Sequence, residues 1–365
     1  MGKLTKTTHW KKIDCDLNVP IFERCKFALG LHGDRYIAVA GGFYSPMMYD
    51  VRSDTIQPLP DTRNEFNIVE SCGVILKGTF YVVRKCWAQS MWCIDLSTKS
   101  RWYEVQLPVG TFEPRLIANE NDLFLFGEKS NFLYNPLARE WSKLPTISQY
   151  LINNAEKFKW IQFQDIIKST YAYSHALVGD NIYIIGGFQI RKNYDITLSS
   201  VEIFNTSSMQ WSEAPPLPIP LEDAATAVVG KHIIVSGGKT INNVNTSIFI
   251  FNTETKIWSR SKCSLPSPRI LHNCVTIGDQ FFSVGGCDHQ FRSNGKYFGM
   301  ESIHLKHLIP DFNWDRMGYL ILLRKLVSEN RAEIGPRKNR EQMIINSCFK
   351  RVDDDLFREV LSFLF

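Results

Sequence analysis

An apolar run that ends in a pair of glycines occurs four times in this sequence, and it constrains the fold more than any other feature. The runs are IAVAGG, IYIIGG, IIVSGG and FFSVGG, which end at Gly42, Gly187, Gly238 and Gly286. A helix does not favour paired glycines, and the interior of a strand gains nothing from them. The pairs therefore indicate a backbone requirement that the chain meets repeatedly.

The spacing of the glycine pairs indicates six repeats. The last three pairs lie 51 and 48 residues apart, and the gap of 145 residues before them is close to three such periods. Two further copies lie inside this gap, TFYVVRK (79–85) and DLFLFGE (122–128). Arg84 and Lys85 take the glycine positions in the first, and the second keeps only Gly127. The repeats are thus marked near residues 41, 84, 127, 186, 237 and 285, at a period typical of repeat folds.

A second signal supports the same register. After each apolar run, a second apolar segment closes on Asn or Asp, a polar turn follows, and a Trp comes next. The pairs are Asp95 with Trp102, Asn135 with Trp141, Asn205 with Trp211 and Asn252 with Trp258, whereas Asp50 is followed by Ile56. This pattern indicates a hairpin. Another short strand ending in a turn opens each repeat, as in ALVGD, so we expect four strands per repeat.

Six repeats of four short antiparallel strands predict an all-β, six-bladed β-propeller. With the diglycine, the Asx turn and the spaced Trp, the chain resembles the kelch-repeat family over roughly residues 8–314. Repeats two and three depart from the pattern by lacking the diglycine, and repeat one lacks the Trp. The resemblance implies a kelch-type propeller over residues 1–314 with a role in protein–protein interaction. We expect structural roles for the glycines, at close approaches between blades, and for the Trp residues, between blades.

Closure of the ring is predicted to involve the N-terminus. An open ring would expose strand edges. The segment around Trp10 looks like the outer strand of a repeat, yet it has no room before it for three more strands. The sixth repeat lacks an Asx turn before Trp314. We therefore expect the N-terminal strand to complete blade six and close the propeller.

Two segments depart from the repeat. Residues 146–170 form an insertion with Tyr150, Phe158, Trp160 and Phe163, which is either a cap packed on the propeller or a docking surface. Residues 315–365 change to a helical period and predict a small α-helical C-terminal extension. Its final helix, DDDLFREVLSFLF, has a weak resemblance to the start of an F-box, which implies recruitment of a ubiquitin-ligase scaffold. The alternative is an amphipathic helix that packs on its neighbours.

Composition narrows the class of protein. The net charge of +5 is mild and spread along the chain, so no nucleic-acid partner is expected. The N-terminus shows no apolar signal segment, and the apolar run YLILL is too short to span a bilayer, so no membrane association is expected. Nine cysteines without regular spacing indicate reduced thiols. We expect a cytoplasmic protein, with the nucleus as an alternative.

Motifs for catalysis are missing from the sequence. It has no GxxxxGK[ST], GxGxxG, HExxH, paired CxxC or GxSxG pattern. His304 and His307 would point to opposite faces of a strand, and Cys86 and Cys93 fit a core better than a metal site. Some kelch-like propellers are enzymes, but their residue sets are not found here. We expect no catalytic residue, metal or cofactor; the alternative is a propeller enzyme that acts on a sugar or small acid at the channel mouth.

Candidate binding residues gather in loops that should share one face. In a four-stranded antiparallel blade, the second-to-third-strand loop and the connection to the next blade emerge on the same side. The candidate partner-binding residues in or beside these loops are Phe43, Tyr44, Arg84, Lys85, Lys129, Arg191, Lys192, Lys239, His289 and Arg292. Bases around aromatic residues favour an acidic peptide or protein surface, and ordinary solubilising charge is the alternative. Arg24 and Arg269 share a repeat position, and each either stabilises the repeat or contacts the partner. The sequence leaves open a ubiquitin-ligase substrate receptor and a cytoskeletal or trafficking scaffold.

Overall fold

The computed structural model describes residues 9–13, 27–41, 44–61, 71–84, 88–111, 114–127, 131–144, 170–190, 195–288 and 299–309. The chain divides into residues 1–308 and residues 309–365, and only Ile309 of the second unit is described. The predicted helical extension and the insertion up to residue 169 therefore lie outside the described residues.

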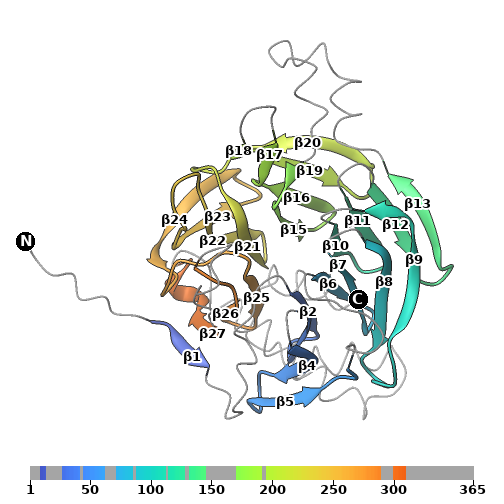
Figure 1. The fold of residues 1–365 in the computed structure, drawn as a ribbon. Helices are drawn as coiled ribbons and strands as arrows, with labels where there is room; N and C mark the ends of the chain where they lie inside the picture. Colours follow the sequence, from blue (N-terminus) through green and yellow to red (C-terminus); the bar gives the residue numbers. More distant parts are fainter. Residues whose placement is uncertain are drawn as a thin grey trace, which may run out of the picture. The chain divides into compact units, whose positions relative to one another are not determined.

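The described strands form six four-stranded antiparallel sheets arranged as the blades of a β-propeller (Figure 1). Blade one consists of β2 (Ala28–His32), β3 (Tyr36–Gly41), β4 (Tyr44–Asp50) and β5 (Thr55–Pro58). Blade two consists of β6 (Ser71–Leu76), β7 (Thr79–Arg84), β8 (Ala88–Asp95) and β9 (Tyr103–Thr111). Blade three consists of β10 (Arg115–Ala118), β11 (Leu123–Phe126), β12 (Asn131–Asn135) and β13 (Glu140–Leu144). Blade four consists of β15 (Ser174–Val178), β16 (Asn181–Ile185), β19 (Val201–Asn205) and β20 (Gln210–Ala214). Blade five consists of β21 (Glu222–Val229), β22 (His232–Lys239), β23 (Ser247–Asn252) and β24 (Ile257–Ser264). Blade six consists of β25 (Asn273–Ile277), β26 (Gln280–Val284), β27 (Met300–His304) and β1 (Lys11–Ile13).

Each blade runs from an inner strand to an outer strand, and Figure 1 shows the inner strands around the centre. Two small elements add to the blades. A three-stranded sheet of β14 (Thr170–Tyr171), β17 (Phe188–Ile190) and β18 (Asp195–Thr197) extends blade four, and a 3₁₀ helix, η2 (Leu305–His307), follows β27. The prediction of an all-β, six-bladed propeller is confirmed.

The second strand of a blade packs against both neighbouring blades. In β7, Phe80 and Val82 lie in a core shared with blade one, and Tyr81 and Val83 lie in a core shared with blade three. Successive side chains of a strand point to opposite faces. A strand between two blades therefore requires apolar side chains at consecutive positions, which explains the uninterrupted apolar runs of the repeat.

The N-terminal strand completes blade six, as the sequence predicted. Strand β1 pairs antiparallel with β27, with Lys11 opposite Ser302 and Ile13 opposite Met300. Ile13 also packs against the apolar core between blades six and one. The propeller is therefore closed by a blade whose strands come from both ends of this unit.

The Trp residues link neighbouring blades through their indole N–H groups. Four of them donate to a main-chain carbonyl in or just after the outer strand of the preceding blade. The bonds are Trp102 to Pro60 (2.9 Å), Trp141 to Gln106 (3.0 Å), Trp258 to Pro215 (2.8 Å) and Trp10 to Ser264 (2.8 Å). Trp10 thus serves blade six as the other Trp residues serve theirs. Its ring also lies edge-on to Phe281, with centroids 6.0 Å apart.

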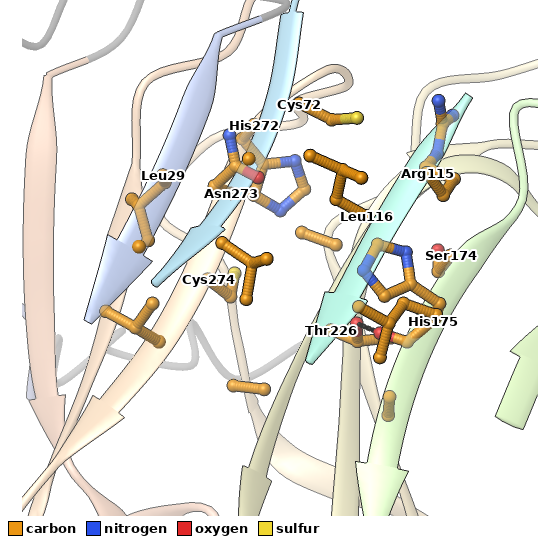
Figure 2. Close-up of a pocket in the computed structure, with 18 of the residues that line it drawn as sticks. Leu29, Cys72, Arg115, Leu116, Ser174, His175, Thr226, His272, Asn273 and Cys274 are labelled. Carbon is orange, nitrogen blue, oxygen red and sulfur yellow. Dashed lines mark hydrogen bonds between the residues drawn. The ribbon is translucent and has the colours of Figure 1, made fainter. Parts of the chain in front are cut away.

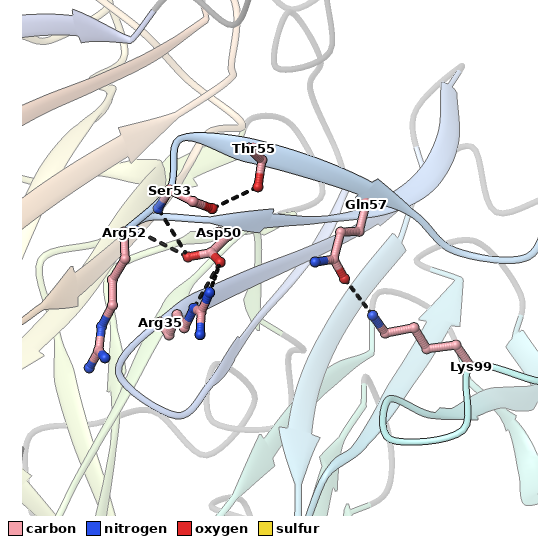
Figure 3. Close-up of polar contacts among 7 residues, drawn as sticks. All are labelled: Arg35, Asp50, Arg52, Ser53, Thr55, Gln57 and Lys99. Atoms are coloured by element: carbon pink, nitrogen blue, oxygen red, sulfur yellow. Dashed lines mark hydrogen bonds and ion pairs between the residues drawn. The ribbon is translucent and has the colours of Figure 1, made fainter. Parts of the chain in front are cut away.

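The predicted Asx turns join the third and fourth strands in five blades. In blade one, Asp50 Oδ1 accepts from the N–H groups of Arg52 (3.0 Å) and Ser53 (3.4 Å) (Figure 3). Its Oδ2 accepts from Arg35 Nε (2.8 Å), and this guanidinium holds the pKa of Asp50 well below its usual range. The equivalent turns are built on Asp95, Asn135, Asn205 and Asn252. Blade six needs no such turn, because its fourth strand comes from the N-terminus.

The paired glycines lie where the second strand of one blade meets the segment that enters the next blade. Gly186 and Gly187 have φ angles of +63° and +95°, and the Gly187 N–H donates to Leu221 O (2.8 Å). A Cβ atom at Gly186 would lie 2.4 Å from that same oxygen. At Gly237 it would lie 2.6 Å from Arg269 O. The expectation of a close approach between blades is confirmed for these pairs.

Deletion of residues 1–14 should sharply lower the melting temperature of the propeller. The deletion removes Trp10 and β1, which exposes the edge of β27 and part of the core between blades six and one. Thermal unfolding followed by circular dichroism measures the effect. Trp10→Phe is the milder comparison, because it keeps a ring but loses the bond to Ser264. An unchanged melting temperature after deletion would contradict the closing role of β1.

Gly186→Ala should destabilise the propeller far more than Gly179→Ala. Both glycines have positive φ angles, +63° and +56°, so each alanine carries a left-handed backbone cost of about 1–2 kcal/mol. Only at residue 186 does the new Cβ also meet main-chain atoms, since nothing lies within 4 Å of the position at residue 179. Urea unfolding of the two variants isolates this contact. Equal losses of unfolding free energy in the two variants would show that the close approach of the backbone at residue 186 to Leu221 O carries no cost.

Candidate functional site

One end of the propeller carries the second-to-third-strand loops together with the connections between blades, and we call it the connector face. Contacts join these two kinds of segment in two blades. Strand β14, in the connection into blade four, pairs with β17 in the loop of that blade. Ile270 pairs with Cys287 in blade six, and in blade five the β21–β22 ladder reaches this face at the pair of Glu222 and Lys239. The loops of this face are therefore braced by the connections beside them.

The connections also bond to one another around the channel mouth. Ala172 and Leu271 lie just before the inner strands of blades four and six, Asp223 is the second residue of the inner strand of blade five, and their φ angles are +51°, +56° and +53°. The Asp223 N–H donates to Ala172 O (2.9 Å), and the Leu271 N–H donates to Asp223 O (3.3 Å). Side-chain-bearing residues rarely adopt this conformation. The bonds between connections compensate for its cost and fix the rim of the mouth.

Three of the predicted partner-binding residues lie at described positions. Arg84 ends β7 with an exposed side chain, Lys239 ends β22 and is half-buried, and Tyr44 begins β4. All three positions lie at the connector-face ends of their strands. Phe43, Lys85, Lys129, Arg191, Lys192, His289 and Arg292 lie outside the described residues. Binding by these residues stays a prediction.

Lys239 has a structural contact that the sequence did not indicate. Its Nζ lies 3.2 Å from Glu222 Oε1, and the Glu222 carboxyl is buried at the start of β21. Burial raises the pKa of Glu222, and the ammonium of Lys239 lowers it in part. Lys239 therefore offsets the cost of a buried carboxylate next to the channel mouth.

Arg269 is a structural residue of the repeat. Its side chain is fully buried, its Nη2 donates to Glu301 Oε2, and its Nη1 donates to Gly285 O (3.3 Å). Burial lowers its pKa, whereas Glu301 raises it. The structural interpretation of Arg269 is confirmed, and Arg24 lies outside the described residues.

Exposed apolar side chains on the connector face were not predicted. Ile190 at the end of β17 is 54% exposed, and Ile241 in the loop of blade five is 78% exposed. Nearby, the rings of Tyr171 and Phe188 pack with centroids 5.5 Å apart. A single isoleucine within a polar loop, as in FQIRKN and KTINN, is the signal that could have identified these residues. They give the face an apolar component beside its charges.

The central channel encloses about 410 Å³ and is lined by the inner strand of every blade, β2, β6, β10, β15, β21 and β25. Figure 2 shows side chains from several of these strands, including Leu116, His175 and Cys274, around a common space. Polar side chains of the inner strands bond across every interface between blades. These bonds are Ser71 to Ala40 O, Cys72 to Pro114 O, Arg115 to Tyr173 O, Ser174 to Ala224 O, Thr276 to Val228 O and Asn273 to Phe27 O. Much of the polar wall is therefore committed to holding the blades together.

A buried polar cluster lies between blades five and six. Ser236 Oγ is 3.2 Å from His272 Nε2 and 3.1 Å from Cys274 Sγ. Burial raises the pKa of the Cys274 thiol to about 12 and holds the pKa of His272 well below its usual value. At neutral pH the thiol is protonated and the imidazole is uncharged. This state does not suit a nucleophile and its base, which need a thiolate or a proton acceptor poised near neutrality.

The histidines near the end of blade six differ from the sequence prediction. His304 ends β27 and His307 lies in η2, and their rings meet edge-on with centroids 6.2 Å apart. The prediction of opposite faces was wrong because the strand ends at His304. A 3₁₀ turn brings residues i and i+3 to the same side. Within the described part of the chain, no group of three or more His, Cys, Asp or Glu residues is placed to hold a metal ion.

Comparison with known proteins agrees with the repeat pattern and the fold. Residues 149–286 match the KLHDC2/KLHL20/DRC7 Kelch-repeats domain. The resemblance to kelch repeats is confirmed. Kelch-repeat propellers are generally protein-interaction modules.

Similar kelch proteins occur in distant organisms. Kelch-like protein terF of Aspergillus terreus is 24% identical over 159 residues, which cover 42% of this chain and 31% of that protein. Kelch-like protein 41b of Danio rerio is 24% identical over 166 residues, covering 45% and 26%. Kelch-like protein 36 of Mus musculus is 22% identical over 297 residues, covering 77% and 44%. This chain thus spans less than half of the length of each of these relatives. Separately, none of the helices among the described residues is long and apolar enough to span a bilayer.

Lys239→Met should destabilise the propeller in a pH-dependent way. It removes the cation beside the buried carboxyl of Glu222, whose folded-state pKa is already raised. The cost applies when Glu222 is ionised, above its ordinary pKa of about 4.3, and is relieved as falling pH protonates it. We expect a loss of about 1–3 kcal/mol at pH 8 and a smaller loss at pH 5, measured by urea unfolding.

The control is the double variant Lys239→Met, Glu222→Gln, in which residue 222 has no carboxylate that could be left without a cation. Its stability should differ from that of Glu222→Gln alone by the same amount at pH 5 and at pH 8. A pH-dependent difference between these two variants would contradict the role assigned to the Glu222–Lys239 pair.

Proposed function

We propose that this protein is a non-catalytic adaptor that binds a partner protein on its connector face. The observation that carries the proposal is the bracing of that face, where β14 pairs with β17 and Ile270 pairs with Cys287. A braced surface loses little conformational freedom on binding, which favours recognition of another protein. The general use of kelch-repeat propellers in protein interaction supports the same conclusion.

The charge of the face favours an acidic partner. Arg84 is exposed at the end of β7, and the sequence places Lys85, Lys129, Arg191, Lys192 and Arg292 in the corresponding loops. Basic side chains attract carboxylates by charge-assisted hydrogen bonds and by long-range steering. Lys239 is a weaker candidate reader than the others, because its ammonium lies beside the buried Glu222 carboxyl.

Ile190 and Ile241 give the same face apolar anchors. Their side chains are 54% and 78% exposed on neighbouring blades. Binding energy at protein interfaces concentrates in a few apolar, aromatic or Arg residues surrounded by polar contacts. A partner that combines carboxylates with apolar side chains would fit this arrangement.

Within this function, we favour a substrate receptor of a ubiquitin ligase over a cytoskeletal or trafficking scaffold. The resemblance of the last helix to the start of an F-box motivates this version. A cytoplasmic or nuclear location agrees with it. An enzyme with a site at the channel mouth is disfavoured by the protonated thiol and uncharged imidazole of Cys274 and His272.

Reversal of charge at Arg191, Lys192 and Arg292 to Glu should weaken partner binding at least tenfold, a change of about 1.4 kcal/mol. The measurement is quantitative affinity purification from cell lysate, followed by titration of the recovered partner. The matched control reverses Arg101, Lys143 and Lys262, which are exposed on or beside outer strands and change the net charge equally. Equal binding by the two triple variants would reject the basic-face proposal.

The same purification with residues 315–365 removed separates the ubiquitin-ligase version from the adaptor function itself. Loss of cullin-scaffold proteins, with retention of the partner bound by the connector face, would support a substrate receptor. Absence of such scaffold proteins from both samples would reject that version and leave the adaptor proposal standing on its own test.

A further inference from the structure

Two histidines meet at the seam that closes the propeller. His9 directly precedes Trp10 and β1, and its ring stacks on that of His307 with centroids 3.9 Å apart and ring planes 5° apart. His307 lies in η2, which directly follows β27, the strand that pairs with β1. The stack therefore connects the residue next to Trp10 and β1 with the 3₁₀ helix that follows β27.

The charged groups around the stack leave it poorly suited to carry two protons. Asp279 Oδ2 lies 3.0 Å from His304 Nε2, so this carboxylate pairs with His304 rather than with the stacked rings. His304 Nδ1 accepts from the Lys306 N–H (3.2 Å), which fixes the edge-on ring of His304 beside His307. The side chain of Lys306 adds a positive charge on the same 3₁₀ helix.

Two protonated imidazoles at this separation would repel each other, because like charges within a few ångströms disfavour the charged forms. The pKa of His307 is lowered, first by burial and then by His9, Lys306 and His304. Histidine is the side chain whose ordinary pKa, about 6.5, places its charge change near neutral pH. The closed seam therefore takes up a proton at His307 less readily than an open one.

We propose that the His9–His307 stack makes closure of the propeller sensitive to pH, so that acidification separates the rings and releases the N-terminal strand. The sign follows from linkage, because the open seam binds more protons than the closed seam. Stability from the neutral stack is fully present above the ordinary pKa of about 6.5 and is lost as the pH falls below it. For each proton taken up, the opening equilibrium rises by at most about tenfold per pH unit.

A metal site fits this geometry less well than a proton switch. The nitrogen lone pairs of an imidazole lie in the plane of its ring, so nearly parallel rings direct them along parallel lines. Tetrahedral zinc needs ligands that converge on one point. His9 and His307 would have to leave the stack before both could bind one ion.

Hydrogen exchange tests the proposal on the full-length chain. Protection of the segment 9–13 is measured by mass spectrometry at pH 7.5 and pH 5.5, after correction for the intrinsic pH dependence of exchange. We expect protection of this segment to fall about tenfold at pH 5.5, while β22 in blade five keeps its protection. His307→Gln and His9→Gln should each remove the difference between the two pH values, and either variant suffices if the other fails to fold.

His32→Gln, at a half-buried histidine of blade one, is the matched control and should retain the wild-type response. A fall in protection that persists in both His9→Gln and His307→Gln would overturn the proposal. An equal fall in β22 would also overturn it, because the acid response would then be global and would come from other histidines, such as the half-buried His232 and the buried His272.

Discussion

The seam within the last blade, where β1 pairs with β27, is the constraint on which the rest of the propeller depends. Each blade packs on a neighbour at both faces, so a series of blades that did not close would leave two apolar faces in water. The chain solves this with a strand of three residues, Lys11–Ile13, paired to β27. So short a strand adds few ladder bonds. Trp10 compensates by reaching Ser264 in the preceding blade, and Ile13 packs toward blade one.

Two sets of polar bonds hold the ring at its centre, in addition to the apolar cores between blades. Side chains of the inner strands, such as Ser174 and Asn273, donate to carbonyls across the interfaces. On the connector face, the connections at Ala172, Asp223 and Leu271 bond directly to one another through left-handed main-chain conformations. Both sets use polar groups that a ligand in the channel would need. These polar groups of the channel wall therefore contribute to closure of the ring.

The repeat pattern made most of this fold predictable, because each of its sequence signals corresponds to a structural requirement of a strand, turn or blade. Apolar runs follow from burial on two faces, Asx residues from the turn that Asp50 builds, and Trp10 from its place in blade six. Side-chain contacts outside the repeat pattern left no such signal. The pairing of Glu222 with Lys239 is one example. The stacked ring of His307 is another, because a strand that ends at His304 cannot be distinguished by composition from one that continues.

Blade two shows how one position can be occupied by backbone alone in some repeats and by a charged side chain in another. Where Gly187 and Gly238 donate to the segment that enters the next blade, the backbone has a left-handed conformation, and a Cβ atom at the adjacent Gly186 or Gly237 would meet a main-chain oxygen of that segment. In blade two, Arg84 pairs with Ser71 in an ordinary ladder and its side chain is exposed. Loss of the glycine thus places a cation at the connector face at the point where the other blades place only backbone. Because the blades differ at this position, the chemical groups around the channel mouth differ from blade to blade although the backbone repeats.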